Sequence, residues 1–321
     1  MNFCTLFDSN YIHKGIALYL SLRGTGVEFT LYVMAMDREC KSRLDSAGFG
    51  DVVVECIDDI EDDALEIARR NRSRAEFCWT CGSYVTHYFL EKYAPEDMTY
   101  LDSDLMFFSS PSVIMDELRQ AGASVGLSPH FNGDDTFGRY CVQYVYFKND
   151  CNGAAILEWW RDECLKWCYS KLEDGKYGDQ KYLENFSSIA PGVHDIGNRG
   201  CGVAYWNMYD YDWDSSPVVF FHYSGVNVMI EEGVLVLEHT FYLPQKIKEL
   251  CIVPYSGLLA EAYSRYLGVC VSRTVIRPVS RIGNEVKHIL YLLRGSKVLK
   301  LLRKTYMTLK YRERKSPYSE R

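Results

Sequence analysis

The chain has 321 residues, is 47% hydrophobic and 25% charged, and carries a formal net charge of −7 at pH 7. This composition is typical of a globular protein with a sizeable core and excludes a disordered or collagen-like chain. No run of 18 apolar residues occurs, which argues against a membrane-spanning helix. The first twenty residues include Asp8, His13 and Lys14 and lack the apolar run of an export signal, so we expect a cytoplasmic protein whose twelve cysteines are reduced.

Segments typical of strands alternate with segments typical of helices through the first two thirds of the chain. Apolar runs predict strands at 2–7, 29–34, 51–56, 123–128, 141–149 and 218–225, and at the stretch that begins with Thr99. Apolar residues at helical spacing predict helices at 13–23, 74–93 and 152–170. This alternation favours an α/β fold with a mostly parallel sheet flanked by helices.

The charge changes sign near residues 245–270, and we expect a catalytic domain at 1–245 and a helical, basic region at 246–321. From residue 271 onward the net charge is +11, whereas the rest of the chain carries −18. Leucine-rich faces opposite Lys and Arg between Asn284 and Lys315 favour binding to an anionic membrane surface. A helical cap on the domain and a homodimer contact remain the alternatives, and the acidic body argues against nucleic-acid binding.

The segment TYLDSDLMFF at 99–108 carries two carboxylates within an otherwise apolar strand pattern. Alternate residues of a strand share a face, so Asp102 and Asp104 repel each other and lose hydration unless a cation or donors neutralise them. In a parallel sheet, ligands bind beyond the carboxyl ends of the strands. We therefore expect both aspartates at that edge, although a turn cap at Asp102 and a solvated Asp104 would give the same pattern.

Two further polar segments follow predicted elements: Gly178-Asp179-Gln180 and the stretch His222-Tyr223-Ser224-Gly225. Carboxylates with an imidazole suit Mn²⁺ or Mg²⁺, which keep positions open for phosphate oxygens. Such an ion would neutralise a diphosphate leaving group.

Seven segments, in order, resemble those of bacterial nucleotide-diphospho-sugar transferases, which are GT-A glycosyltransferases akin to family 8. They are FCTLFDSNYIHKGIALYLSL, RSRAEFCWT, TYLDSDLMFFSSP, YVYFKND, LEWWRDECLKWC, EDGKYGDQKYL and FFHYSG, which together span residues 3–225. The resemblance implies a Rossmann-like GT-A sheet and a metal-dependent, retaining transfer of a sugar from a nucleoside diphosphate. The basic C-terminal region suggests that the acceptor is a hydroxyl of a glycan or lipid-linked molecule in cell-surface polysaccharide synthesis, made at the inner face of the membrane.

The resemblance also implies roles for individual residues. Asp102, Asp104 and His222 would bind Mn²⁺ or Mg²⁺, and Asp179 and Gln180 would line the donor-sugar pocket beside the reacting carbon. The nucleotide-sugar donor would be held by Asp8, Asn10, Tyr11, Arg72, Asp102, Ser103 and Gly225.

Two positions depart from the pattern of these transferases. Cys141 and Gln143 stand where an N-x-G element helps to shape the sugar pocket, so the resemblance does not identify the sugar.

His130 could serve the acceptor side or simply be a hydrogen-bonded loop residue. A haloacid-type phosphatase also uses D-x-D after a strand, but Met106 replaces the Thr or Val that it needs. A non-catalytic nucleotide-sugar or membrane scaffold is the remaining alternative.

Overall fold

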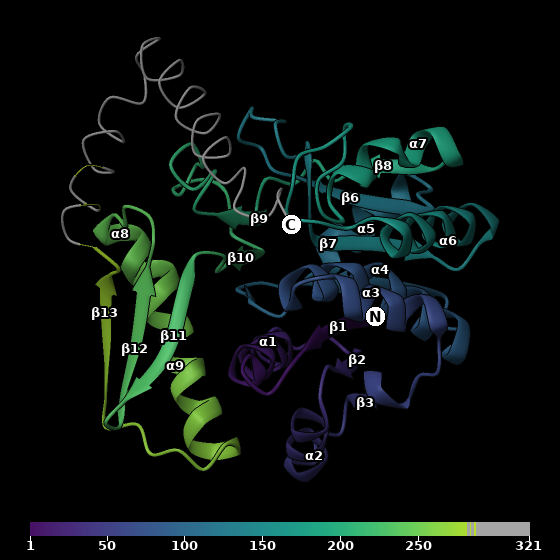
Figure 1. Cartoon of the computed structure of the whole chain (residues 1–321). Helices are drawn as coiled ribbons and strands as arrows, with labels where there is room; N and C mark the ends of the chain where they lie inside the picture. The colour runs from purple at the N-terminus through teal and green to yellow at the C-terminus, as the bar shows by residue number, and fades with distance from the viewer. Residues whose placement is uncertain (281–282, 284–285, 287–321) are drawn as a thin grey trace, which may run out of the picture. The chain divides into compact units, whose positions relative to one another are not determined.

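The computed structural model describes residues 1–280, 283 and 286 (Figure 1). The strands are β1 (Asn2–Phe7), β2 (Thr30–Ala35), β3 (Val52–Cys56), β4 (Asp97–Leu101), β5 (Leu105–Phe107), β6 (Val125–Pro129), β7 (Tyr140–Lys148), β8 (Val193–Asp195), β9 (Cys201–Ala204), β10 (Phe220–His222), β11 (Val226–Glu231), β12 (Val234–His239) and β13 (Arg273–Pro278). The helices are α1 (Ile12–Gly24), α2 (Arg38–Ala47), α3 (Asp63–Asn71), α4 (Arg74–Tyr93), α5 (Ser112–Gln120), α6 (Cys151–Lys166), α7 (Phe186–Ile189), α8 (Gln245–Ile247) and α9 (Val253–Glu261).

A seven-stranded sheet forms the centre of the first compact unit, which comprises Met1–Ser224 and Cys251–Val271. Its strand order is β3-β2-β1-β4-β7-β6-β8; β7 runs antiparallel to both of its neighbours, and the other neighbouring pairs are parallel. This confirms the predicted α/β class with a mostly parallel sheet. The carboxyl ends of β1 and β4 therefore meet at one edge of the sheet.

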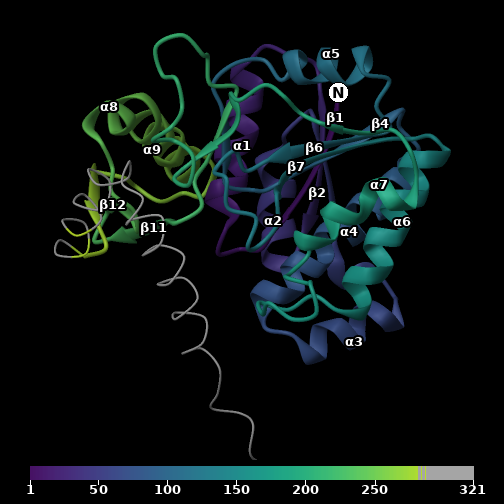
Figure 2. The same cartoon turned by 90° about the horizontal axis from the view of Figure 1, so that it is seen from above.

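The two faces of this sheet are buried in two separate cores, as strand alternation requires. On β1, Cys4 and Leu6 pack among residues of α4 and α6, whereas Phe3 and Phe7 pack among residues of α1 and α5. Figure 2 shows α4 and α6 together on one side of the sheet and α1 on the other. Because both faces are covered, ligands reach this sheet at its edge rather than on a face.

The chain that leaves β4 continues into a small second sheet of the first unit, which has the strand order β5-β10-β9. Strands β5 and β10 are antiparallel, and their register places His222 opposite Leu105. Phe220 and Phe221 of β10 are fully buried, so the strand is anchored by its apolar residues while its last residue lies beside the β4–β5 turn.

The second compact unit comprises Gly225–Leu250 and the described residues from Ser272 onward, and it contains the sheet β11-β12-β13. Strands β11 and β12 form a hairpin whose two-residue turn, Glu232-Gly233, has positive φ at both residues. Sequence patterning had not identified this hairpin, although a short loop with glycine between apolar runs is its usual signal. The division predicted after residue 245 falls inside this unit.

The C-terminal region predicted to be helical from residue 246 begins with α8 and α9 but also contains β13. Strand β13 pairs in parallel with β12 and includes the β-branched residues Thr274, Val275 and Ile276, which favour extended backbone. The predicted basic amphipathic segment, Asn284–Lys315, lies outside the described residues apart from Val286. In the part of the chain that is described, no helix combines the length and apolar character needed to cross a bilayer.

Candidate active site

The paired aspartates lie at the carboxyl end of β4, in the turn that leads into β5. The backbone N–H of Asp102 donates to the carbonyl oxygen of Gln143 on the adjacent β7 at 3.1 Å, which holds the start of the turn against the sheet. Leu101 and Leu105 on either side are fully buried. The buried flanks fix the turn, and its two carboxylates are left to face the same space.

His222 meets both carboxylates from the end of β10. Its Nε2 lies 3.0 Å from Oδ1 of Asp104 and 3.6 Å from Oδ2 of Asp102. The N–H of Tyr223 donates to the carbonyl oxygen of Asp104 at 2.9 Å, which continues the β5–β10 pairing past the histidine. The structure thus brings Asp102, Asp104 and His222 together, although the histidine is far from the aspartates in sequence.

Gln143 sets the orientation of the His222 ring. The amide Nε2 of Gln143 donates to Oγ of Ser128 at 3.2 Å, so its Oε1 is the atom that accepts from Nδ1 of His222 at 2.9 Å. With Nδ1 carrying a proton, the lone pair of a neutral ring is on Nε2, which faces the aspartates. Sequence analysis identified Gln143 only as a departure from the transferase pattern.

Burial and mutual charge shift the pKa values of all three groups. Burial raises the pKa of Asp102 to about 7. Burial also disfavours ionised Asp104, but His222 and Lys14 outweigh it and hold the pKa of Asp104 below its usual range. Burial alone would lower the pKa of His222, yet the charge of Asp104 and its hydrogen bond raise that pKa well above its usual value. A proton on His222 therefore stands where a metal ion would supply positive charge.

The donor set fits a divalent cation. Two carboxylates and an imidazole nitrogen converge within ordinary contact distances, and because Nδ1 is held by Gln143, Nε2 is the nitrogen that can exchange its proton for a cation. Oxygen ligands with one imidazole suit Mn²⁺ or Mg²⁺. Asp102, Asp104 and His222 are the residues that would hold such an ion.

Lys14 is a site residue that sequence analysis did not identify. It lies in the first turn of α1, is 5% exposed, and its Nζ is 3.5 Å from Oδ2 of Asp104 and 4.6 Å from the centre of the Tyr11 ring. The signal was present: a lysine within the apolar first turn of a buried helix needs an anionic partner.

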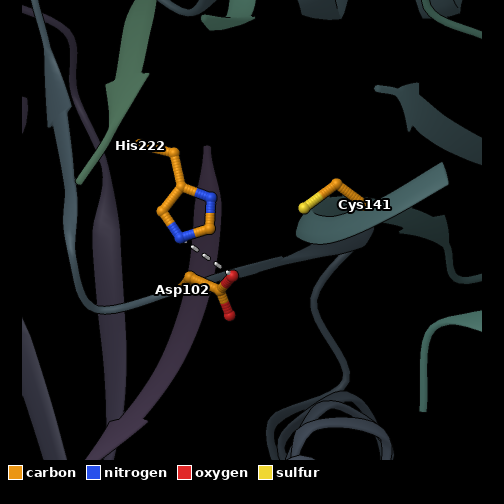
Figure 3. Close-up of side chains that lie close together, drawn as sticks. All are labelled: Asp102, Cys141 and His222. Carbon is orange, nitrogen blue, oxygen red and sulfur yellow. Dashed lines mark ion pairs between the residues drawn. The ribbon is translucent and has the colours of Figure 1, made fainter. Parts of the chain in front are cut away.

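Asp179 and Cys141 lie in the same neighbourhood. Burial, followed by the charge of Asp102, raises the pKa of Asp179 well above its ordinary value. The backbone carbonyl of Asp179 accepts from the indole Nε1 of buried Trp160 at 3.0 Å, and Gln180 Nε2 donates to the carbonyl of Phe137 at 2.9 Å. Figure 3 shows Cys141 pointing toward the space that Asp102 and His222 share. Although burial raises the pKa of the Cys141 thiol, hydrogen bonds with His130 and His222 outweigh burial and lower it to about 6.

Comparison with known proteins gives two kinds of relative, while no family model matches. Two uncharacterized proteins of Bacillus subtilis (strain 168), YfnF and YfnD, are each 28% identical to the chain. The alignment with YfnF covers 71% of this chain and 82% of YfnF, and the alignment with YfnD covers 72% of this chain and 79% of YfnD. Galactosyltransferase LgtC, solved with donor and acceptor sugar analogs, superposes with a TM-score of 0.53 at 14% identity, over 81% of this chain and 96% of its own. Apo GlyE, a glycosyltransferase of Streptococcus pneumoniae TIGR4, superposes with a TM-score of 0.51 at 15% identity, and the superposition covers 82% of this chain and 63% of GlyE.

The chain has a GT-A glycosyltransferase fold. The fold predicted from the sequence is confirmed, while membership of family 8 stays a prediction.

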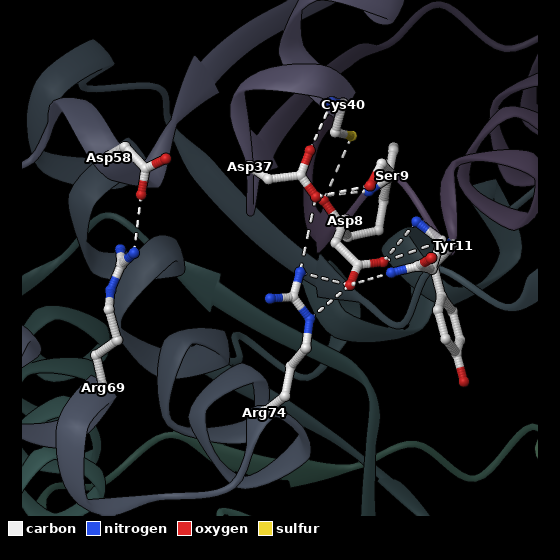
Figure 4. A network of polar contacts seen from close by, with 10 residues as sticks. Asp8, Ser9, Tyr11, Asp37, Cys40, Asp58, Arg69 and Arg74 are labelled. Atoms are coloured by element: carbon white, nitrogen blue, oxygen red, sulfur yellow. Dashed lines mark hydrogen bonds and ion pairs between the residues drawn. The ribbon is translucent and has the colours of Figure 1, made fainter.

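The carboxyl end of β1 provides a second polar cluster at the edge of the GT-A sheet (Figure 4). One oxygen of Asp8 accepts from the N–H groups of Asn10 and Tyr11, both at 3.0 Å, and thereby closes the turn before α1. Its other oxygen lies 2.5 Å from Nη2 of Arg74, whose Nη2 is also 3.7 Å from Asp37 at the end of β2. Asn10 and Tyr11 are exposed, as contact with a nucleotide would require.

Arg72 and Arg74 diverge at the start of α4. Ser73 caps the helix in a capping box with Glu76, so Arg74 is its first helical residue whereas Arg72 is extended. Arg72 donates to the carbonyl of Leu165 at 2.7 Å and to Oγ1 of Thr80, and it therefore joins α4 to the end of α6. Arg74, which sequence analysis overlooked, is the arginine that reaches Asp8; the signal was the RSR run at 72–74.

The donor-binding role of every residue predicted from the sequence stays a prediction. Ser103 lies in the β4–β5 turn between the two aspartates. Gly225 is the first residue of the second unit, and its φ of +80° is a conformation that favours glycine.

Proposed function

We propose that the protein is a metal-dependent glycosyltransferase that moves a sugar from a nucleoside diphosphate to a hydroxyl group of an acceptor. The observation that carries the proposal is the approach of His222 Nε2 to within 3.0 and 3.6 Å of Asp104 and Asp102 at the edge of a GT-A sheet. LgtC and GlyE support the fold, YfnF, YfnD and GlyE support a bacterial context, and the site residues supply the chemistry.

In this proposal Asp102, Asp104 and His222 hold Mn²⁺ or Mg²⁺. When bound, the ion neutralises the charge that develops on the departing diphosphate. Gln143 keeps the His222 ring in place, and Lys14 holds Asp104 through an ion pair at 3.5 Å. Asp8, Asn10, Tyr11 and Ser103 contact the nucleotide portion of the donor.

Asp179 and Gln180 orient the donor sugar. Burial, followed by the charge of Asp102, raises the pKa of Asp179 well above its ordinary value, and a protonated carboxyl group can donate a hydrogen bond to a sugar hydroxyl, which an ionised carboxylate cannot do. Gln180 is anchored through its amide nitrogen, which leaves its carbonyl oxygen available to the sugar. Transfer proceeds with retention of the anomeric configuration, and the transferred group is a hexose.

The acceptor in this proposal is a glycan or lipid-linked molecule used in cell-surface polysaccharide synthesis. The basic segment from residue 271 onward, with a net charge of +11, would hold the enzyme at the inner face of the membrane where such acceptors are made. Domain 1–245 would provide the catalytic residues.

Thermal-shift screening of UDP- and GDP-sugars with and without Mn²⁺ tests donor binding, because a ligand at 100 times its Kd stabilises the folded state by about 2.7 kcal/mol. Donor hydrolysis then tests turnover. We expect Asp104→Ala to lower Mn²⁺-dependent hydrolysis by on the order of 100-fold or more, since several kcal/mol of charge stabilisation are lost. The matched control is Asp116→Ala, an exposed aspartate on α5. Folded protein that binds donors but turns none over would favour a non-catalytic scaffold.

A further inference from the structure

Cys141 and Gln143 act on His222 from the same face of β7. Residues two apart on a strand point the same way, and both side chains approach the His222 ring. Gln143 holds Nδ1 at 2.9 Å. The Sγ of Cys141, one carboxylate oxygen of Asp102 and one ring nitrogen of His222 all lie within 4.8 Å of one another. Figure 3 shows the three side chains pointing toward one another.

Two of the three side chains are buried, whereas the Asp102 side chain is 28% exposed. Cys141 is 5% exposed and His222 is 7% exposed. Asp104, the fourth group nearby, is already paired with Lys14 through its Oδ2 at 3.5 Å. Asp102, Cys141 and His222 are therefore an oxygen, a sulfur and a nitrogen ligand that face one shared space.

We propose that Cys141 is a thiolate ligand of the divalent cation, which adds affinity for borderline ions such as Zn²⁺, Co²⁺ or Fe²⁺ to a site whose carboxylates also accept Mn²⁺ or Mg²⁺. Ligand softness is the reason: carboxylate-rich sites suit Mg²⁺ and Mn²⁺, whereas thiolate with imidazole selects Zn²⁺ and similar ions. The thiol proton leaves to solvent as the sulfur–metal bond forms, and the cation keeps its oxidation state. The proposal rests on the proposed function in assigning the cation to the donor site, but the thiolate ligand can be tested without turnover.

The test uses the full-length protein, freed of metal and titrated with Co²⁺. Thiolate bound to Co²⁺ gives a charge-transfer band in the near ultraviolet that oxygen and nitrogen ligands do not give. We expect the band in the wild type and its loss in Cys141→Ser and Cys141→Ala. The matched control is Cys4→Ser on β1, where the thiol is equally buried but contacts Thr86, and that variant should keep the band.

Calorimetric titration gives the second readout. Cys141→Ser should weaken Zn²⁺ binding by at least about tenfold, since loss of even an outer partner of a metal ligand costs that much, while Mn²⁺ binding changes little. The proposal is overturned if wild-type protein binds Co²⁺ without the band, or if the band survives in folded Cys141→Ser. Circular dichroism establishes folding of each variant.

The two proposals fail in different ways. A missing cobalt band together with intact Mn²⁺-dependent donor hydrolysis would remove the thiolate ligand and leave the transferase standing. A band that depends on Cys141, with no hydrolysis or transfer from any donor, would leave the thiolate site standing and remove the transferase.

Discussion

Gln143 determines which nitrogen of His222 faces the carboxylates, so its side chain should control metal affinity without touching the metal. Gln143→Leu removes the acceptor for Nδ1 while keeping similar volume, and the ring is then free to turn or to change tautomer. We expect metal binding to weaken by about 10- to 100-fold, the usual cost of losing such an outer partner. Isothermal titration with Mn²⁺ and Zn²⁺ measures the change.

Gln143→Glu is the matched control. The carboxylate still accepts from Nδ1, and the Ser128 hydroxyl can turn to donate to its other oxygen. Affinity in this variant should match or exceed that of the wild type, because a carboxylate raises the basicity of the ligating ring. Equal weakening by Leu and Glu would mean that the residue acts only by filling space.

His13 makes a second residue-scale prediction, about stability and pH. The ring is 6% exposed and stacks on Tyr263 with centroids 5.1 Å apart, and burial followed by the charge of Lys14 lowers the pKa of His13 to about 3. In the unfolded chain its pKa is about 6.5, so between these values the unfolded state binds more protons. Its contribution to stability is complete above pH 6.5 and is lost as the pH falls toward 3, at about 1.4 kcal/mol per pH unit.

The measurement compares wild type with His13→Phe, which keeps a ring against Tyr263 but does not titrate. Between pH 7 and pH 5, urea unfolding should show about 2 kcal/mol more loss of unfolding free energy in the wild type than in the variant. Parallel losses in the two proteins would show that His13 titrates normally in the folded state.

At the scale of elements, the first turn of α6 lies so close to the backbone of β7 and of the residue before β6 that only glycine fits at position 153. A Cβ at Gly153 would lie 2.1 Å from the backbone oxygen of Lys148 and 3.0 Å from that of Ser124. Backbone atoms cannot move aside cheaply, so Gly153→Ala should lower the free energy of unfolding by on the order of 1–3 kcal/mol. Gly257→Ala in α9 meets no atom within 4 Å and should raise it by up to about 1 kcal/mol. Urea unfolding of both variants measures these changes in unfolding free energy. Similar changes in the two variants would contradict the proposed close contact at Gly153.

Which elements and which site residues the sequence predicts depends on how local their causes are. The alternation on β1 and the apolar run before Asp102 depend on neighbouring residues, so the strands and the two carboxylates could be predicted from patterning. His222 was assigned by resemblance, since its approach to Asp104 depends on the β5–β10 register. Lys14 and Gln143 were missed because each has a partner on a distant element.

The arginines at the start of α4 show the same limit over a shorter distance. Arg72 and Arg74 have the same side chain, and only the cap at Ser73 separates the extended residue from the helical one. One helix start therefore sends one arginine to Leu165 and the other to Asp8. The sequence motif identified the segment at 72–74, and the helix cap at Ser73 determines that Arg74 rather than Arg72 reaches Asp8.

At the scale of the whole molecule, the charge asymmetry makes the last prediction. A body of −18 and a C-terminal region of +11 should meet an anionic membrane through that region alone. We expect the protein to co-sediment with vesicles that contain anionic lipid at 0.1 M salt and to be released at 0.5 M, where screening is stronger. Each basic residue near such a surface contributes about 1 kcal/mol, so neutralising four should weaken partitioning on the order of a thousandfold.

The variant that tests this changes four basic residues of the C-terminal region to alanine: Lys297, Lys300, Arg303 and Lys304. Its matched control makes the same change at four exposed arginines of the first unit: Arg38, Arg43, Arg70 and Arg119. Both variants lose the same charge. If binding depended only on the net charge of the molecule, vesicle binding would therefore weaken equally in both. Release of the first variant with retention of the second would establish that the basic segment, rather than the net charge of the molecule, binds the membrane. If both stay bound, the attachment is not electrostatic and the leucine-rich faces become the segment to test.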